Sequence, residues 1–422
     1  MRFVQIHFLT SYPAALLNRD DAGLAKRVPF GGATRTRVSS QSLKRHWRTH
    51  EGAHSLHMLG EGLSVRSRET FEREIVQRLV VDQGLDLEMV RGATRALLTG
   101  LLGESAKAKK TAEGEDAKAK KAGDGGEPVH TGQITVLGAP ELSYLRGLVA
   151  EVAAGGSTPK MAEEAMLKKL KDKDLAKNLK AIKLGPGLDA ALFGRMVTGD
   201  ILARVDAAIH VAHAFTVHAE EAESDYFTAV DDLLQSGDED GNSLGAGHVN
   251  ATELTSGLYY GYVAVDFPLL ISNLEGCARK KWQEADKTLA SRVLAEFIHL
   301  VATVSPGAKL GSTAPHSYAQ LILVELGDEQ PRTLANAFLR PVRAQNDLLA
   351  TTYRALSGHL ADLDRMYGRT HERRLAAMGD DPSIGQLVET LGLEGTLSLP
   401  ELAAWLTERV SGARHAVPAG AR

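Results

Sequence analysis

The sequence predicts an α+β protein in which a β-sheet domain is interrupted by a helical insertion. Three stretches read as strands because polar and apolar residues alternate along them: residues 2–10, about 203–218 and about 257–271. Residues from about 67 to 190 carry helical spacing instead, and helical spacing returns after residue 285. Strands on both sides of a helical block indicate that the block is inserted into the sheet domain.

The composition is that of an ordinary globular chain. The 422 residues are 43% hydrophobic and 24% charged with a net charge of -4, enough to bury a core in one large or two to three smaller units. The lone Cys277 excludes an intramolecular disulfide and fits a reducing, cytoplasmic setting. No segment reads as a signal peptide or as the roughly 20 apolar residues of a membrane span, so we expect neither export nor a membrane partner.

The helical insertion has two recognisable parts. Phe71, Ile75 and Leu79 repeat at four-residue spacing, and residues 158–183 form a lysine-rich amphipathic run. Between them, residues 104–127 repeat AKAKK and contain equal numbers of lysine and acidic residues, with no large apolar side chain. Such a segment cannot bury enough surface to offset its ordering entropy, so we expect a mobile loop. An RNA-binding tail is the alternative, which the balancing acids weaken.

Residues 236–248 form a glycine- and acid-rich break between two stretches with strand character. This pattern predicts a hairpin of two extended arms around a flexible tip. Tyr226, Phe227 and Val230 lie at the base of the first arm. Aromatic and branched side chains there can wedge between stacked bases, and they can equally pack into the core or against a neighbouring subunit. Composition alone favours packing.

Residues 31–48, GGATRTRVSSQSLKRHWR, are strongly basic in a chain that is slightly acidic overall. Gly31 and Gly32 allow a close approach of the backbone to another group. Arg35 and Arg37 alternate with threonines, as in a strand with one basic face. Any contact that this segment makes with phosphates must therefore be local.

The helix predicted after this strand has two different faces. Ser39 or Ser40 supplies its N-cap. At 100° per residue, Leu43 and Trp47 share one face, and the other face carries Gln41, Lys44, Arg45 and Arg48. The first turn also offers unpaired backbone amides and the positive end of the helix dipole, so hydroxyls, amides and a lysine can converge on one phosphate. A phosphate cradle and a solvated basic face are both open interpretations.

Candidate catalytic and metal-binding groups are sparse. Asp20 and Asp21, next to Arg19, can bind a divalent ion or act as a base, but such a pair more often orients an arginine or closes a turn. His210 and His218 would point to one side of a strand and His213 to the other, so the three do not form a ligand trio. GxSxG, Walker and HExxH motifs do not occur. We therefore expect no catalytic residue, cofactor or metal.

Residues 9–48 closely resemble the N-terminal signature of the CasC family, the backbone subunit of the type I-E CRISPR complex Cascade, an RNA-guided surveillance complex. The resemblance rests on NRDD, FGG and RTRVSSQSLKR, and then on GRM, AHAFTVH, DYFTAVDDL, TSGLYYGY, PGAK and NAF, which follow in the family's order. It extends from residue 3 to about residue 340. The long, repetitive segment 104–127 departs from the family's pattern.

The resemblance implies a fold shaped like a right hand. Its palm would resemble an RNA-recognition (ferredoxin-like) sheet, and it would carry a helical fingers insertion and a β-hairpin thumb. The expected boundaries are 1–54, 191–221 and 253–422 for the palm with the C-terminal helices, 55–190 for the fingers with their mobile loop 104–127, and 222–252 for the thumb.

The resemblance also assigns roles to individual residues. Guide-RNA phosphates would be held, without reading of sequence, by Arg19, Lys26, Ser39, Ser40, Gln41, Lys44 and Arg48, to which the basic strand adds Arg35 and Arg37. Tyr226, Phe227 and Val230 would belong to a thumb that folds over the guide of the adjacent subunit. Met196 would lie near a nucleotide that is displaced at regular intervals.

The implied function is that of a non-catalytic subunit in antiviral defence. Copies of the chain would stack along one CRISPR RNA (crRNA) as a right-handed helical filament and present it to a target DNA strand in an R-loop. Further partners would be the large and small subunits, the Cas5-type and Cas6-type subunits, and a recruited helicase-nuclease. Two alternatives remain: a type III-like backbone subunit that cleaves RNA with Asp20 or Asp21, and a structural protein that polymerises without nucleic acid.

Overall fold

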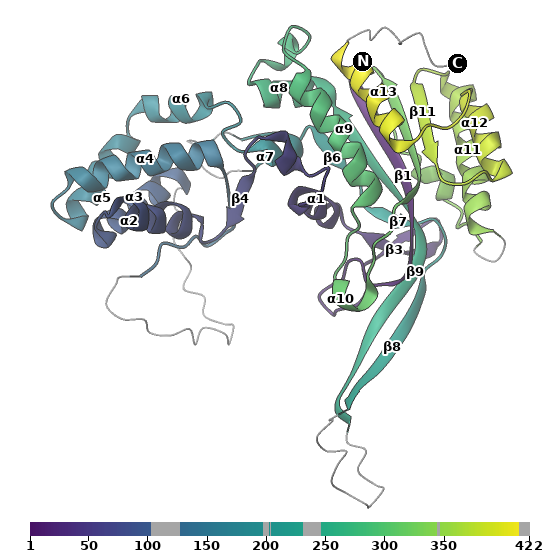
Figure 1. Cartoon of the computed structure of the whole chain (residues 1–422), viewed down its shortest axis with the longest axis horizontal. Coiled ribbons are helices and arrows are strands. Elements are labelled where there is room, and N and C mark those ends of the chain that lie inside the picture. Colours follow the sequence, from purple (N-terminus) through teal and green to yellow (C-terminus); the bar gives the residue numbers. More distant parts are fainter. Residues whose placement is uncertain (103–126, 197–201, 203, 231–245, 344–346, 413–422) are drawn as a thin grey trace, which may run out of the picture. The chain divides into compact units, whose positions relative to one another are not determined.

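The chain folds into two compact units of mixed helices and strands (Figure 1). This computed structural model describes residues 1–102, 127–196, 202, 204–230, 246–343 and 347–412. The first unit comprises Met1–Ser55, His210–Phe267 and Ser291–Arg422, and the second comprises Leu56–Ile209 and Pro268–Ala290. The second unit thus begins one residue after the expected start of the insertion, ends beyond residue 190, and takes in a later segment that the sequence patterns did not indicate.

A large antiparallel sheet forms the centre of the first unit. Strand β1 (Phe3–Ala15), which was predicted over residues 2–10, pairs with β10 (Ala319–Gly327) on one side and β9 (Ala246–Asp266) on the other. The order across the sheet is β11-β10-β1-β9-β7-β3-β2, with β11 at Glu372–Ala377, β7 at Ala214–Thr216, β3 at Ala33–Val38 and β2 at Arg27–Phe30. Two further strands, β6 (Ile209–Val211) and β8 (Glu221–Val230), pair with β9 outside this order. The edge strand of this sheet is therefore β2, and its neighbour β3 belongs to the basic segment.

Both faces of the sheet are covered, because every residue from Val4 to Thr10 is buried although their side chains alternate in direction. The Leu9 face packs against α11 (Leu348–Tyr367) and α12 (Pro382–Leu391). Figure 1 shows α9 (Thr288–Thr303) on the other side. Helix α13 (Leu399–Ser411) begins at a capping box formed by Ser398 and Glu401.

A buried ionic network joins the central strands. The Glu325 carboxylate on β10 accepts hydrogen bonds from His7 on β1 at 3.2 Å, Arg373 on β11 at 2.6 Å and Arg332 at 2.5 Å. Arg373 also pairs with Asp364 on α11. Burial alone would raise the pKa of Glu325, but the hydrogen bonds and positive charges of these partners hold it well below its usual value. The network ties three strands and one helix together.

Two of the predicted strands were wrong in extent. The stretch 257–271 leaves the sheet at Asp266 and continues as α8 (Phe267–Glu275), whose first turn accommodates Pro268. A short apolar run does not by itself distinguish a strand from a buried helix. Within residues 204–218, the described part of the second stretch, the strands are β6 (Ile209–Val211) and β7, and Val205 makes an isolated bridge with Arg195.

The hairpin predicted around residues 236–248 has the two expected arms. Strand β8 (Glu221–Val230) pairs antiparallel with the first part of β9, from Glu221 opposite Ser256 to Val230 opposite Ala246. We call these paired arms the hairpin. Residues 231–245, which include most of the predicted tip, lie outside the described part of the chain.

The second unit is mainly helical and has its own core. Phe71, Ile75 and Leu79 lie buried together there, so the helical spacing was read correctly. The small two-stranded sheet β4 (Ser64–Ser67) and β5 (Thr135–Gly138) was not predicted. Its described helical elements are the π-turn Glu72–Gln77, α2 (Arg78–Gln83), α3 (Leu87–Leu102), α4 (Ala139–Gly155), α5 (Pro159–Leu170), α6 (Lys173–Ala181), α7 (Leu188–Phe193), α8 from Pro268 onward, and the 3-10 turns Leu56–Leu59 and Arg279–Lys281.

The structure bears only in part on two further expectations, the mobile loop 104–127 and the lack of a membrane span. The predicted mobile loop 104–127 lies outside the described residues except for Glu127. Across the described residues, no helix combines the length and apolar character needed to cross a membrane.

Candidate nucleic-acid interface

The basic segment begins with a tight turn between β2 and β3. Gly31 and Gly32 have φ values of +62° and +79°, which glycine adopts without strain, and they form the turn that joins the last β2–β3 pair, Phe30 and Ala33. A Cβ atom on Gly31 would lie 1.5 Å from the carbonyl oxygen of Leu339. The close approach that the glycines allow is therefore to the protein's own backbone.

Arg35 does not belong to an exposed basic face, and this prediction was wrong. Its side chain is fully buried, and its guanidinium donates to the carbonyl oxygens of Thr216 at 2.8 Å and Phe338 at 2.9 Å. Arg37, two residues further along β3, is half-buried and donates to the Arg27 carbonyl oxygen at 3.1 Å. Arg35 holds the sheet edge to the rest of the first unit and cannot reach a phosphate.

Ser39 is the N-cap of the helix, as one of the two predicted alternatives. Its hydroxyl accepts from the Ser42 amide at 3.2 Å, and helix α1 runs from Ser40 to Thr49. The Ser39 amide donates to the Asn18 side-chain oxygen at 2.9 Å. Because Ser39 is buried, its hydroxyl positions the helix start, and the following Ser40 and Gln41 are the residues that lie nearer the surface.

Helix α1 has the anchored face and the basic face that the sequence predicted. Leu43 and Trp47 are buried, and the Trp47 ring packs edge-on against Phe297 with centroids 5.2 Å apart. On the opposite face Gln41 and Arg45 are exposed, and Lys44 and Arg48 are half-buried. The anchoring face fixes the helix so that its first turn and its cations stay at the edge of the sheet.

His213 joins this group, and sequence reasoning missed it. Its Nδ1 accepts from the Ser40 amide at 3.1 Å and lies 3.2 Å from Arg37 Nη1. Desolvation and the charges of Arg37 and Lys26 lower the pKa of His213, so its ring is neutral near pH 7. An accepting Nδ1 places the ring proton on Nε2, which is then a hydrogen-bond donor. Strand pairing of Arg37 with Phe215 creates this contact, which no spacing in the sequence indicates.

The loop before β2 lies beside the start of α1. Asp20 accepts from the amides of Ala22 at 2.9 Å and Leu24 at 3.0 Å, so its carboxylate closes a turn, as the simpler interpretation had it. Arg19 is exposed, and the Lys26 amide donates to the Asn18 carbonyl oxygen at 2.9 Å. Asn18 thus connects this loop to the start of α1. Among the described residues, no group of three His, Cys, Asp or Glu side chains could hold a metal.

The hairpin separates its two aromatic residues. Tyr226 and Phe227 are consecutive on β8, so their side chains point to opposite faces. Tyr226 is 66% exposed and Phe227 is 41% exposed. Val230 lies in the last pair of β8, and its side chain is outside the described set. The two rings cannot act together on one side of the hairpin.

The root of the hairpin is held to β2, the strand that precedes the basic segment. Arg27 on β2 pairs with Glu220 at 2.5 Å and with Glu253 on β9. Glu253 also accepts from the Ala25 amide at 2.6 Å. Arg27 thus has a structural partner on the hairpin, a role that its position in a basic run does not reveal.

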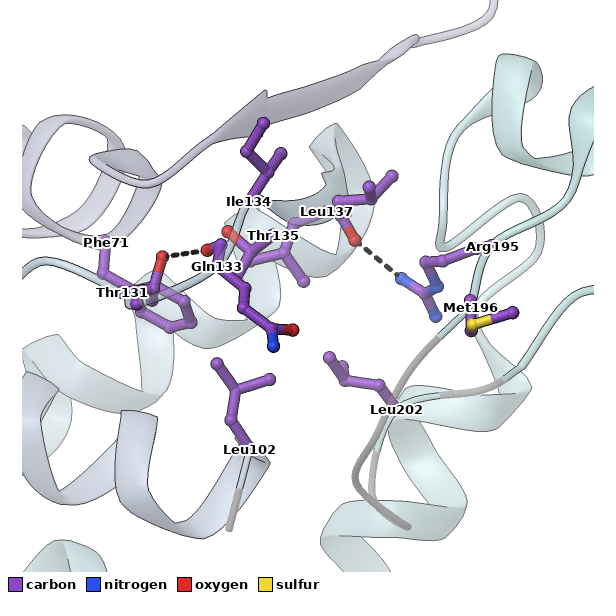
Figure 2. A pocket seen from close by; sticks show the side chains of 12 residues that line it. Phe71, Leu102, Thr131, Gln133, Ile134, Thr135, Leu137, Arg195, Met196 and Leu202 are labelled. Atoms are coloured by element: carbon purple, nitrogen blue, oxygen red, sulfur yellow. Dashed lines mark hydrogen bonds between the residues drawn. The ribbon is translucent and has the colours of Figure 1, made fainter. Parts of the chain in front are cut away.

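Met196 lies in the second unit, at the rim of a small cavity of about 70 Å³. Its side chain is 87% exposed, whereas the adjacent Arg195 is buried and pairs with Glu141 at 2.5 Å. Figure 2 shows Arg195 donating toward the strand that carries Thr135 and Leu137, and Met196 beside it. The exposed thioether is available to a ligand of this unit.

A family model described as CT1975-like protein matches residues 4–405. The chain belongs to the CT1975-like protein family. No curated protein sequence matches it. Its structure is similar to a chain of a CRISPR RNA-guided surveillance complex in a pre-nicking form, with a TM-score of 0.71 and 27% identity over 97% of this chain and 100% of that one. A second CRISPR RNA-guided surveillance complex contains a chain of the same fold, with a TM-score of 0.64 and 22% identity over 96% and 99% of the two chains.

In this CT1975-like protein, the arrangement around the start of α1 can bind a phosphate. The Ser40 and Ser42 amides already donate to His213 and Ser39, so the hydrogen-bond donors offered here are the Gln41 amide, the Ser40 hydroxyl and the neutral His213 ring. Lys26 and Arg37 supply charge nearby. The chemistry that this edge offers is recognition of a polyanion backbone.

Proposed function

We propose that the chain is the crRNA-binding backbone subunit of a type I-E CRISPR Cascade, of the CasC type. The observation that carries the proposal is the similarity, over 97% of this chain, to a chain of an RNA-guided surveillance complex, and the basic residues at the sheet edge within residues 19–48 support it. The antiparallel sheet of the first unit would be the RNA-recognition-like palm, the second unit the fingers, and the hairpin the thumb.

The guide would be held through its phosphates. Ser40, Gln41, Lys44 and Arg48 on α1, with Arg19, Lys26 and Arg37, would contact the sugar–phosphate backbone, and base pairing would supply sequence specificity. Each copy carries one short basic strip on a chain of net charge -4. Tight binding would then require many copies aligned on one RNA, as a filament provides.

The remaining assignments extend to the partners. The hairpin of one copy would fold over the guide of the next and displace a nucleotide at regular intervals, with Met196 beside it. The other Cascade subunits would complete the complex, the paired guide and target DNA strand would form an R-loop, and a recruited helicase-nuclease would destroy the target. The chain itself would be non-catalytic, which is consistent with the use of Asp20 in a turn.

The proposal is tested by charge reversal on α1. The chain is expressed with its neighbouring subunits and a guide, and Lys44→Glu with Arg48→Glu is compared with the unaltered complex. We expect loss of copurifying RNA and of the large assembly, because the two introduced carboxylates would repel the negatively charged guide phosphates. The matched control is Arg292→Glu with Arg365→Glu, which reverses two positive charges at exposed positions on α9 and α11.

Folding of each variant is checked by circular dichroism and thermal unfolding. Retention of RNA by a folded Lys44→Glu, Arg48→Glu complex would mean that the strip is a solvated face, and the proposed guide-binding site would be wrong.

A further inference from the structure

A cavity of about 290 Å³ lies in the first unit, between the root of the hairpin and the short helix α10 (Leu310–Thr313). The groups that line it differ in chemistry: an acid, an aromatic ring, an amine, three hydroxyls and one apolar side chain. They are Asp225, Phe227, Thr252, Leu254, Lys309, Ser312 and Thr313. None of these residues except Phe227 was a candidate on the basis of the sequence.

Lys309 is held in this cavity by two contacts. Its ammonium donates to the Thr252 hydroxyl and lies 5.5 Å from the centroid of the Phe227 ring. A cation over an aromatic face is attracted to it, so Phe227 and Lys309 fix each other. Only part of the ammonium's donor capacity is used by Thr252, because an ammonium carries three N–H groups. The amine is therefore oriented and can still donate into the cavity.

The face of the hairpin that borders the cavity is acidic. Glu221, Glu223 and Asp225 alternate on β8 and lie on the same face as Phe227. A row of carboxylates repels phosphates, so an RNA backbone cannot run along this face. A phosphate can be accepted only at Lys309, and the group that meets Asp225 must be a hydrogen-bond donor.

A ribonucleotide satisfies all of these requirements. Its phosphate would take the Lys309 ammonium and the hydroxyls of Ser312 and Thr313, its base would lie against the Phe227 ring, and its 2′-hydroxyl would donate to the Asp225 carboxylate. A deoxyribonucleotide has no such donor and would leave the carboxylate facing a polyanion without a partner.

We propose that this cavity binds one ribonucleotide of the bound strand and that Asp225 distinguishes RNA from DNA through the 2′-hydroxyl. The proposal rests on the proposed function, from which it takes RNA as the ligand. It adds a sugar-specific contact to an interface that otherwise recognises only phosphates.

The test compares the affinities of the full-length chain for single-stranded RNA and for DNA of the same sequence. Asp225→Ala is measured beside Glu223→Ala, which removes the same charge from the same face of β8 but does not line the cavity. Both variants lose one negative charge from this face, so any general gain in affinity for a polyanion is the same in the two. Only Asp225→Ala is expected to lower the ratio of RNA affinity to DNA affinity, by roughly tenfold, as a hydrogen bond to a charged group allows.

Lys309→Met supplies a second signature. Loss of one phosphate contact should weaken RNA and DNA binding alike and reduce the slope of log affinity against log salt by about 0.7, the value for one contact on a single strand. Asp225→Ala should leave that slope unchanged. Thermal unfolding establishes that each variant is folded.

The outcomes separate this proposal from the function on which it rests. If the unaltered chain prefers RNA and Asp225→Ala keeps that preference, the proposal is wrong while the proposed function stands. If Asp225→Ala changes only the size of the assembly, the acidic face docks another copy of the chain, and the proposal is again wrong. If the unaltered chain and its complex bind no RNA, both fail.

Discussion

Single basic residues in the segment 27–48 have different tasks, and the sequence does not distinguish them. Arg35 binds carbonyl oxygens inside the fold, Arg27 clasps the hairpin, and Lys44 lies on the surface face of α1. The N-cap and the two faces of α1 could be predicted because they depend on residues within one or two helical turns. The burial of Arg35 and the position of His213 could not, since both depend on pairing with residues more than 170 positions away.

Arg35→Met should destabilise the protein by about 2 to 4 kcal/mol, because buried carbonyl oxygens lose their donor. The measurement is the free energy of unfolding in denaturant. Arg37→Met is the control, since Arg37 is half-buried at the same strand and should cost less. An Arg35→Met variant as stable as the unaltered chain would contradict the role given to this guanidinium.

At the scale of elements, the hairpin shows what local patterns can and cannot predict. Its two arms were predictable because a glycine- and acid-rich break separates two extended stretches. Its attachment was not, because the clasp joins Arg27 to Glu220 and Glu253 across most of the first unit's sequence. The opposite orientation of Tyr226 and Phe227 follows directly from strand geometry once β8 is known.

Arg27→Met should loosen the root of the hairpin, because it leaves Glu220 and Glu253 without their shared cation. Amide hydrogen exchange along β8 should become faster, while exchange in the central strand β1 should stay unchanged. Arg19→Met, at an exposed arginine in the loop before β2, is the control. Equal exchange in β8 for both variants would show that the clasp does not hold the hairpin.

For the molecule as a whole, histidines that lose solvent on folding should make stability depend on pH, His7 being buried and His299, His359 and His371 half-buried. Burial lowers the pKa of His7 below 6.5, and the same cause lowers those of His299, His359 and His371. The unfolded chain therefore binds more protons than the folded chain below about pH 6.5, and stability should fall as the pH decreases from there. The depressed pKa of Glu325 adds a further loss at more acidic pH, below the ordinary pKa of a glutamate.

The expected result is a lower melting temperature at about pH 5.5 than at about pH 7.5, with a smaller difference in His7→Gln. Differential scanning calorimetry at low protein concentration gives both values. A melting temperature that is constant over this range would contradict the neutral state assigned to the buried histidines.

The division into two units was predictable only in outline. Helical spacing marks the main insertion, because amphipathic periodicity is a local property. The sequence does not indicate that Pro268–Ala290 belongs to the second unit, because the apolar residues of α8 read as a continuation of strand β9. Packing of distant segments, which no local pattern records, decides where that boundary falls.

The contact between guide RNA and residues 19–48 can be measured directly by lysine acetylation with and without RNA, read by mass spectrometry. Lys26 and Lys44 should become protected when RNA is bound, because phosphates would cover their amines. Lys280 and Lys281, exposed on the second unit, provide the comparison within the same sample. Protection of Lys26 and Lys44 beyond that of Lys280 and Lys281 is the predicted result; equal reactivity of Lys26 and Lys44 in the two states would contradict the proposed guide-binding edge.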